Sequence, residues 1–430
     1  MAFRPYVEQV AIPVSRPGSL VAEVTPQGQR VTHVLLKYPH ELLGIEDLRS
    51  AFEVKVKGFP GADPVVTRNI VEAYSSFGAQ VGSPSAGRYV VIKLDVRDSA
   101  SSVWGSVTSN EDKIEVAEGV PGSIKKTSIR QPKKSPVPLE GVTYTVTQVG
   151  HLTTAEGDDV PPFTTEIALD SQRIFDPALS EFSPGKYDDK LPKSQPLRYQ
   201  LRVSKKKNAP LVVFLHGSGQ YGDDNISQLL SSRGAVGVLD FEDAFVLAPQ
   251  YESVFDPSES LQAKRHIRGI HWQSSHRQKQ VIDLIKRTVR EYPEIDTRRI
   301  YIHGLSRGAE GALDISAKAP NLIAGALVIS GRELGARQLV TGLASRADYR
   351  SLSRVPIWFF HSKGDPTAPL EGTVSNVQEL KRVNASKVKY TEFSVGGVPN
   401  NGWKNESPHN SWDAVYNSPS AWSWLLSQSK

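Results

Sequence analysis

The first 170 residues alternate between short apolar runs and clusters of turn-forming residues. Residues 58–64 and 83–87 are rich in Gly, Pro, Ser, Ala and Asp, and they separate runs that are β-branched or alternate apolar with polar positions. Several short strands at this spacing, with little helical periodicity, predict a β-sandwich over residues 1–170. The predicted strands cover residues 6–14, 29–38, 51–59, 89–96, 142–149 and 163–169.

From Pro196 onward the pattern changes to apolar strands interleaved with helical segments. Residues 210–216 form a continuous apolar run that ends before glycines, as buried parallel strands do. Residues 280–292 alternate apolar and charged positions with a helical period, and residues 421–428 predict a closing helix. We therefore expect an α/β domain over residues 196–430, with a mostly parallel sheet covered on both faces. Further strands are predicted at residues 245–248, 300–303, 323–330, 357–361 and 388–395.

The connection between the two predicted domains, residues 171–195, is rich in Pro, Lys, Ser and Asp and predicts a linker. A chain of 430 residues is long enough for two or three domains. No run approaches the roughly 18 consecutive apolar residues of a membrane span, so none is expected. The N-terminal residues contain no apolar signal region, which leaves a cytoplasmic protein or a secreted one whose signal has been removed.

Composition excludes several kinds of chemistry. The chain has no cysteine, which rules out disulfides, thiolate metal sites and a cysteine nucleophile. Its 51 basic and 46 acidic residues give a net charge of +5, and this near balance leaves no footprint for nucleic acid. His266, His271 and His276 recur every five residues, a spacing that does not place two ligands on one helix face. Neither a metal nor another cofactor is therefore expected.

The central motif is the pentapeptide GLSRG at residues 304–308, which directly follows a predicted strand. Small residues at 309–312 then begin a helix. A strand that turns sharply into a helix holds its serine in a strained conformation, and bulky neighbours would clash where the two glycines stand. The start of the helix would direct free N–H groups and the positive end of its dipole at a reacting carbonyl. The pattern predicts Ser306 as a nucleophile.

A serine needs a base to take its proton, and the base needs an acid to orient it. In this arrangement the partners follow the nucleophile in the order acid, then histidine. Only His361 and His409 follow Ser306. His361 lies at the end of a predicted strand and precedes the best acid, so His409 is the predicted base.

The acid is expected in the loop after the next-to-last strand, where Asp365 follows the strand predicted at residues 357–361. The simpler interpretation of Asp365 is a turn residue in a Gly-Asp-Pro bend. Because all three residues fall in the required order and context, we predict that Asp365 orients His409. Glu333 is the second choice of acid, and Asp413 is a weaker one.

A tetrahedral oxyanion needs hydrogen-bond donors. One predicted donor is the backbone N–H of Arg307, the residue after the nucleophile. The second is expected from residues 216–219, where glycines allow the backbone to approach a substrate closely, and either Gly217 or Ser218 supplies it. We interpret His216 as a structural residue that holds this loop.

These residues resemble the α/β-hydrolase superfamily, and within it they look most like bacterial esterases sometimes described as predicted peptidases. That group is also similar to polyhydroxybutyrate-depolymerase-like and feruloyl esterases, and some members carry an N-terminal immunoglobulin-like domain. One departure is Arg307, where relatives commonly have Met; its side chain would contact an acidic substrate or pair with Glu310. The matching segments are residues 212–219, 295–301, 304–308 and 361–365, and His409 with Trp412.

Two tryptophans are candidates for the wall of a substrate pocket. Trp412 comes three residues after the predicted base, and Trp272 precedes the helix that leads to the motif. Large aromatic side chains are as often ordinary packing, so both functions remain open. The two dozen residues between the strands that end near 330 and begin near 355 are too few for a large lid. We expect a small, open site that favours short or extended esters.

The predicted activity is hydrolysis of carboxylic esters, small or polymer-linked, through an acyl-serine intermediate. A serine peptidase with the same three residues is the alternative within the enzymes. From another class comes a binding protein, in which the sandwich over residues 1–170 recognises a polysaccharide, a surface or a second copy of the chain. Comparing the C-terminal domain alone with the full chain, on soluble and insoluble substrates, would separate a targeting function of the sandwich from simple structural support.

Overall fold

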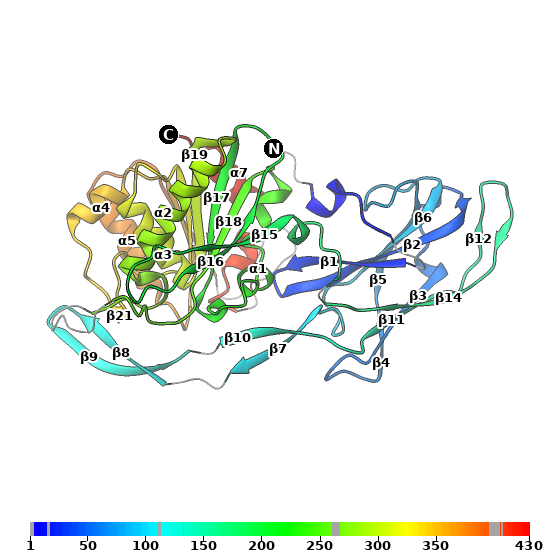
Figure 1. The fold of residues 1–430 in the computed structure, drawn as a ribbon, viewed down its shortest axis with the longest axis horizontal. Coiled ribbons are helices and arrows are strands. Elements are labelled where there is room, and N and C mark those ends of the chain that lie inside the picture. Colours follow the sequence, from blue (N-terminus) through cyan, green and yellow to red (C-terminus); the bar gives the residue numbers. More distant parts are fainter. Residues whose placement is uncertain are drawn as a thin grey trace. The chain divides into compact units, whose positions relative to one another are not determined.

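The computed structural model describes residues 4–14, 18–109, 113–131, 133–171, 173–259, 267–394, 405 and 407–430 (Figure 1). The chain forms two compact units. The sandwich unit consists of Arg4–Val107 and Pro136–Glu181. The α/β unit consists of Thr108–Ser135 and Phe182–Lys430. The chain therefore leaves the sandwich unit after Val107 and contributes 28 residues to the α/β unit. It then returns to the sandwich unit at Pro136 and enters the α/β unit again at Phe182.

The sandwich unit contains two four-stranded antiparallel sheets, whose strand orders are β1-β2-β6-β5 and β14-β11-β3-β4. Alternate positions such as Val34, Val54 and Val146 point inward and are fully buried in one core. This alternation is the pattern from which the sandwich was predicted. The strands are β1 Gly18–Thr25, β2 Gly28–Leu42, β3 Phe52–Lys57, β4 Val65–Arg68, β5 Ile70–Ser76, β6 Gly87–Leu94, β11 Thr143–Gln148 and β14 Thr164–Ala168; the pair β12 Leu152–Thr153 and β13 Asp159–Val160 stands apart.

The strand predicted at residues 6–14 is wrong. A single turn of 3₁₀-helix, Tyr6–Gln9, begins this segment, and the residues that follow it are irregular up to residue 14. Tyr6 and Val7 are both buried. A helical turn allows neighbouring side chains to pack in one direction, whereas a strand would direct them to opposite faces.

The α/β unit is built on one eight-stranded sheet in the order β15-β16-β18-β17-β19-β20-β22-β23. The first two pairings are antiparallel and the other five are parallel. Strand β15 lies within the segment predicted as a linker, and its Pro and Gly are tolerated because it is an edge strand. The strands are β15 Phe182–Tyr187, β16 Leu197–Arg202, β17 Ala209–Leu215, β18 Phe245–Gln250, β19 Ile295–Leu305, β20 Gly325–Ile329, β22 Ile357–Ser362 and β23 Val388–Phe393.

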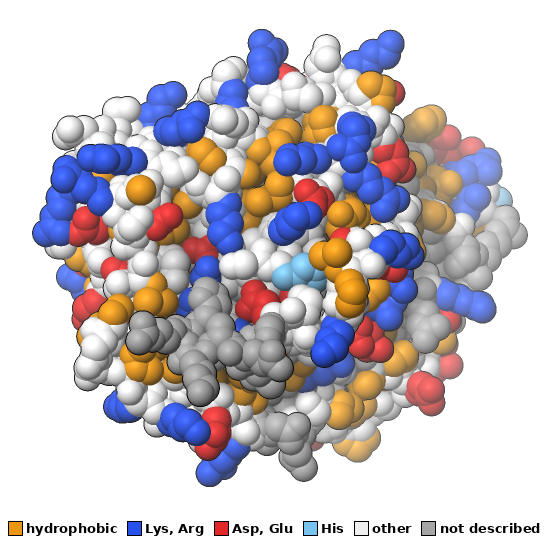
Figure 2. Space-filling model, turned by 60° about the vertical axis from the view of Figure 1, so that its left-hand side comes forward, with side chains coloured by type: hydrophobic (Ala, Val, Ile, Leu, Met, Phe, Trp, Pro, Cys, Tyr) orange, Lys and Arg blue, Asp and Glu red, His pale blue; other side chains and the backbone are white. Residues whose placement is uncertain are grey.

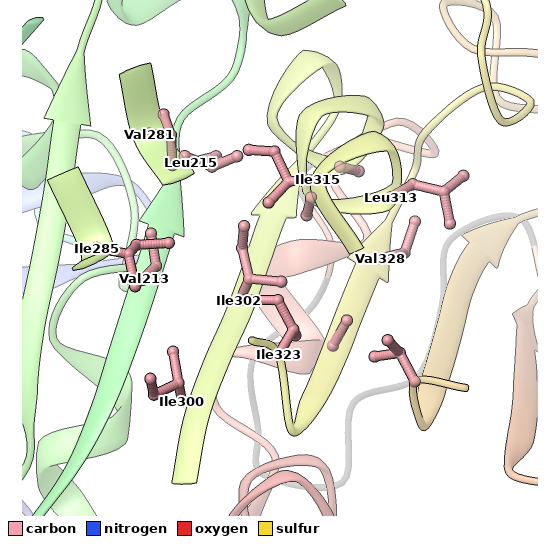
Figure 3. Packing of buried hydrophobic residues seen from close by; sticks show 14 of the residues in the cluster. Val213, Leu215, Val281, Ile285, Ile300, Ile302, Leu313, Ile315, Ile323 and Val328 are labelled. Carbon is pink, nitrogen blue, oxygen red and sulfur yellow. The ribbon is translucent and has the colours of Figure 1, made fainter. Parts of the chain in front are cut away.

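Both faces of this sheet are covered, as predicted. On one face, Val213, Leu215, Ile300 and Ile302 pack in a core with side chains from helices α2 and α3 (Figure 3). Helices α4 and α5 add side chains to the same core. The side chain of His303, which alternates with Ile302, points the other way and contacts rings near the C-terminus. The helices are α2 Ser275–Glu291, α3 Arg307–Lys318, α4 Arg346–Leu352, α5 Leu370–Arg382 and α7 Pro419–Leu426, with the short α1 Ser227–Leu230 and α6 Trp412–Val415.

A hairpin from the N-terminal half belongs to the α/β unit. Strands β8 (Lys113–Val120) and β9 (Ser123–Arg130) pair with each other, and β8 pairs with β21 (Leu339–Val340), as Figure 1 shows. The strands β7 (Trp104–Ser109) and β10 (Lys133–Pro138) form the ribbon that leads to it. Residues 113–130 fall within the range 1–170 that was predicted as the sandwich. One face of the hairpin mixes Ile and Val with polar side chains and the other is mostly polar, and only Val116 of the two strands is buried, so the hairpin adds little apolar area to the sandwich core.

The surface carries charges of both signs. Figure 2 shows Lys and Arg side chains spread over one face, interrupted by acidic and hydrophobic side chains. Among the described residues, no helix is long and apolar enough to cross a membrane.

The start of α2 is held by a histidine between two carboxylates. Nδ1 of His276 lies 2.8 Å from Oδ2 of Asp256, and its Nε2 lies 2.6 Å from Oδ2 of Asp189. Both ring nitrogens must donate, so the imidazole is protonated. The hydrogen bond to Asp256 and the one to Asp189 raise the pKa of His276 against the opposing effect of burial. Arg277 adds a second cation 3.8 Å from Asp256.

We expect this cluster to make stability depend on pH. Because the folded pKa of His276 is raised, the stabilisation is complete below the unfolded pKa of about 6.5 and is lost as the pH rises through the folded pKa. In urea unfolding, His276→Gln should cost about 2 kcal/mol near pH 6 and less near pH 9. The matched control is His151→Gln, which removes an exposed pair with Asp159 and should change little at either pH. If the loss in free energy of unfolding stays constant or grows with pH, the stabilisation does not come from a protonated His276.

Candidate active site

Ser306 stands at the turn between β19 and α3. Its backbone has φ 53° and ψ −120°, a strained conformation for a residue with a side chain, and its N–H donates to the Ile329 carbonyl at 2.9 Å. The helix that follows packs closely on strand β17. A Cβ added to Gly308 would lie 1.9 Å from the carbonyl oxygen of Leu215, so only glycine fits there. The local sequence therefore determines where the serine hydroxyl is presented.

The structure brings together the three residues predicted to act with each other. His409 Nε2 lies 3.0 Å from Ser306 Oγ, and His409 Nδ1 lies 2.8 Å from Asp365 Oδ2. With Nδ1 protonated, His409 donates to Asp365 and accepts from the serine hydroxyl. Asp365 follows β22, and His409 lies just ahead of α6. Ser306 and His409, which are 103 positions apart in the sequence, thus belong to one hydrogen-bonded chain that ends at Asp365.

The carboxylate of Asp365 is held by four donors. Oδ1 accepts the N–H groups of Thr367 and Ala368 at 2.8 and 3.0 Å, and Oδ2 accepts from His409 and from His361 Nε2 at 3.1 Å. Burial raises the pKa of Asp365, but hydrogen bonds from the two histidines outweigh it and hold this pKa below its usual range. The group is therefore a carboxylate at neutral pH.

The two alternative acids lie elsewhere. Glu333 accepts the Gly342 N–H at 2.6 Å and the Ser375 hydroxyl at 2.7 Å. Asp413 is buried in the first turn of α6. The described hydrogen bond from His409 to a carboxylate goes to Asp365.

The hydrogen bond from His361 to Asp365 was not predicted from the sequence, where His361 was considered only as a base and set aside. This side chain is fully buried. Its Nδ1 accepts from the Thr373 hydroxyl at 2.8 Å, and its Nε2–H is shared between Asp365 and the Ala368 carbonyl at 2.9 Å. It therefore fixes both the carboxylate and the loop that carries it. The available signal was a histidine at a strand end, four residues before an acid.

Buried aromatic side chains contact the loop after β17 from the core side. Trp272 is fully buried and donates its Nε1–H to the His216 carbonyl at 2.9 Å, and its ring lies edge-on to that of His216. The His216 ring donates from Nδ1 to the Gly217 carbonyl at 2.7 Å. Burial lowers the pKa of His216 to about 4, so the ring is neutral. Trp272 thus supports the loop from the core, and His216 lies where a structural histidine was expected.

The predicted oxyanion donors lie on adjacent backbone segments. Gly217 and Ser218 begin a 3₁₀ turn, and Arg307 begins α3. A Cβ on Gly308 would come within 2.8 Å of the His216 carbonyl oxygen, which places the helix start against this loop. The first N–H groups of a helix have no partner within it. The two segments can therefore offer donors to one atom.

The side chain of Arg307 pairs with Glu310 rather than facing outward. Its Nη1 lies 2.9 Å from Glu310 Oε2, and Arg332 Nη1 lies 3.1 Å from Oε1 of the same carboxylate. Burial raises the pKa of Glu310, but the two arginines outweigh it and lower the pKa overall. Arg332 also donates to the Thr367 carbonyl at 2.6 Å, beside Asp365. Of the two interpretations of Arg307, the ion pair is the one the structure contains.

The remaining predicted residues have separate surroundings. Trp412 is half-buried, and its ring lies edge-on to His409 with ring centroids 5.1 Å apart. His266 lies outside the described residues. His271 bonds to Tyr251, whereas His276 belongs to the carboxylate cluster described above.

This architecture, a serine at a strand-to-helix turn on a mostly parallel sheet, is that of the α/β hydrolases. Residues 18–161 match a family model described as the esterase Ig-like N-terminal domain. The crystal structure of a thermostable esterase is 27% identical, with a TM-score of 0.71, over 97% of this chain and 100% of that chain. The chain is therefore a carboxylic ester hydrolase of the α/β-hydrolase fold with an N-terminal immunoglobulin-like domain.

Two looser structural matches are named for other activities. A ferulic acid esterase from Anaeromyces mucronatus is 15% identical with a TM-score of 0.41, over 57% of this chain and 90% of that chain. An acylaminoacyl peptidase from Pyrococcus horikoshii is 16% identical with a TM-score of 0.39, over 59% of this chain and 43% of that chain. No curated protein matches the sequence.

Proposed function

We propose that the chain hydrolyses carboxylic esters through an acyl-serine intermediate on Ser306. His409 Nε2 takes the hydroxyl proton as Oγ attacks the ester carbonyl carbon, and the resulting oxyanion collapses with loss of the alcohol, which receives that proton. Water then attacks the acyl-serine with the same base and releases the acid. The observation that carries the proposal is the hydrogen-bonded chain from Ser306 through His409 to Asp365.

The charge that develops on the carbonyl oxygen needs donors that are already in place. The backbone N–H of Arg307 supplies one, and Gly217 or Ser218 supplies the other. Their backbone segments are kept adjacent by the close approach of α3 to β17. Because this approach is fixed before any substrate binds, the donors need little reorganisation during the reaction.

Asp365 stays ionised and stabilises the imidazolium that forms on His409. The donors on its carboxylate fix the oxygen that faces His409, so the ring keeps one tautomer. His361 acts through Asp365, and it is therefore a positioning residue.

We propose a preference for short, aryl or extended esters over long-chain lipids. The segment between β20 and β22 contains only β21 and the seven-residue α4, which is too little chain for a large helical lid. Trp412, edge-on to His409, offers an aromatic surface beside the base.

The test is hydrolysis of a p-nitrophenyl ester series from acetate to palmitate. We expect turnover to be highest on short acyl chains and to fall at least about 10³-fold in Ser306→Ala, since the nucleophile is lost. Activity that survives this substitution would refute the assignment of Ser306 as the nucleophile. A preference for palmitate would refute the short-chain proposal, and p-nitroanilide turnover near the ester rates would favour the peptidase.

A second prediction concerns His361. Leucine removes both ring nitrogens at similar volume, so His361→Leu should lower kcat about tenfold with little change in KM. His361→Gln keeps an N–H for Asp365 and should recover part of the loss. The matched control is His303→Leu, another buried histidine of the same sheet, whose ring contacts Tyr416. Rates are expressed per active serine, titrated with a fluorophosphonate. Equal losses in the leucine variants at 361 and 303 would contradict a positioning function.

A further inference from the structure

The hairpin of β8 and β9 is joined to the rest of the α/β unit by hydrogen bonds at several places. Gly119 of β8 pairs with Val340 of β21, and its carbonyl accepts the Thr341 N–H at 3.0 Å. Just past β9, the Gln131 side chain accepts from His271 Nε2 at 3.0 Å. The hairpin therefore docks through specific hydrogen bonds, which set its register against β21.

Gln338, directly before β21, connects this hairpin to the interior. Its side-chain oxygen accepts the Ala117 N–H of β8, and its side-chain nitrogen donates to the Arg268 carbonyl at 3.1 Å. Its backbone exchanges hydrogen bonds with Gln273, and its carbonyl accepts from Arg307 Nη1 at 3.2 Å. Gln338 is buried and has φ 57°, a conformation that surrounding contacts must hold in place.

From Gln338 the contacts continue without a gap to the proposed catalytic acid. Arg307, which follows the nucleophile, shares the buried carboxylate of Glu310 with Arg332. Arg332 donates to the Thr367 carbonyl, and the N–H of Thr367 donates to Asp365. Each step is a direct hydrogen bond or ion pair. One charged chain of contacts thus joins the elbow and the acid loop to the strand that receives the hairpin.

We propose that Gln338 is a positioning residue, through which the docked hairpin sets the geometry of the nucleophile turn. This inference rests on the function proposed for Ser306. The bond from Ala117 keeps the left-handed backbone of Gln338 in place, and that backbone holds its carbonyl on Arg307. When the bond is absent, the Gln338 carbonyl no longer accepts from the Arg307 side chain. The first turn of α3, which carries the oxyanion donor, is then held by one hydrogen bond fewer. The bond from Ala117 to Gln338 is therefore the hairpin's link to the nucleophile turn.

The structure offers a matched pair of prolines for the test. Ala117 pairs with Lys126 across the hairpin. Because the Ala117 N–H points away from β9 toward Gln338, the Lys126 N–H opposite it points away from β8. Strand β9 is the edge of its three-stranded sheet, where proline is tolerated. Ala117→Pro removes the bond to Gln338, whereas Lys126→Pro places the same residue on the same rung without touching it.

We expect Ala117→Pro to lower kcat about three- to tenfold with KM for p-nitrophenyl acetate unchanged, and Lys126→Pro to stay within about twofold of wild type. Rates are again expressed per titrated serine, so a misfolded fraction does not count. Gln338→Met removes the other end of the same bond together with the bond to the Arg268 carbonyl, and it should lose at least as much as Ala117→Pro. The double variant should lose no more than Gln338→Met alone, since the bond between Ala117 and Gln338 is already absent there.

Equal effects of the two prolines, or additive losses in the double variant, would overturn the inference. Wild-type kcat in both Ala117→Pro and Gln338→Met would overturn it as well. These results are separable from a failure of the proposed function, because that failure appears as activity remaining in Ser306→Ala measured beside them.

Discussion

Two backbone segments, the end of β17 and the first turn of α3, approach so closely that a single added carbon at Gly308 would overlap the Leu215 carbonyl oxygen. This contact depends on glycine and on the strained turn at Ser306. It places the serine hydroxyl above the sheet, and it sets the loop at residues 216–218 against the start of the helix. Every other part of the site is arranged around these two segments.

Buried charge around this contact is compensated in two layers. The inner layer is Asp365, whose carboxylate has four hydrogen-bond donors. The outer layer is Glu310, held between the guanidinium groups of Arg307 and Arg332. A buried carboxylate without such partners would take up a proton and lose its charge. Both layers also fix geometry, because Arg332 reaches Glu310 from outside α3 and His409 reaches Asp365 from the segment ahead of α6.

The sequence was sufficient where the determining interactions are local. The glycines at residues 304–308 imply a tight turn whatever surrounds them, and His409 followed from the order of the chain. It was insufficient where a residue's function depends on a distant partner. His361 binds the acid only because the loop folds back over its strand, and the bond of Gln338 to the hairpin spans 221 residues. The hairpin at residues 113–130 has strand-like local sequence, which does not specify the sheet it joins.

The function of Ser306 as the nucleophile is tested most directly by mapping a fluorophosphonate adduct with peptide mass spectrometry. These reagents modify serines that an adjacent base has activated. We expect a single adduct on Ser306 that forms in step with loss of esterase activity, and much slower labelling in His409→Ala. An adduct on another serine, or full inactivation with Ser306 unmodified, would contradict it.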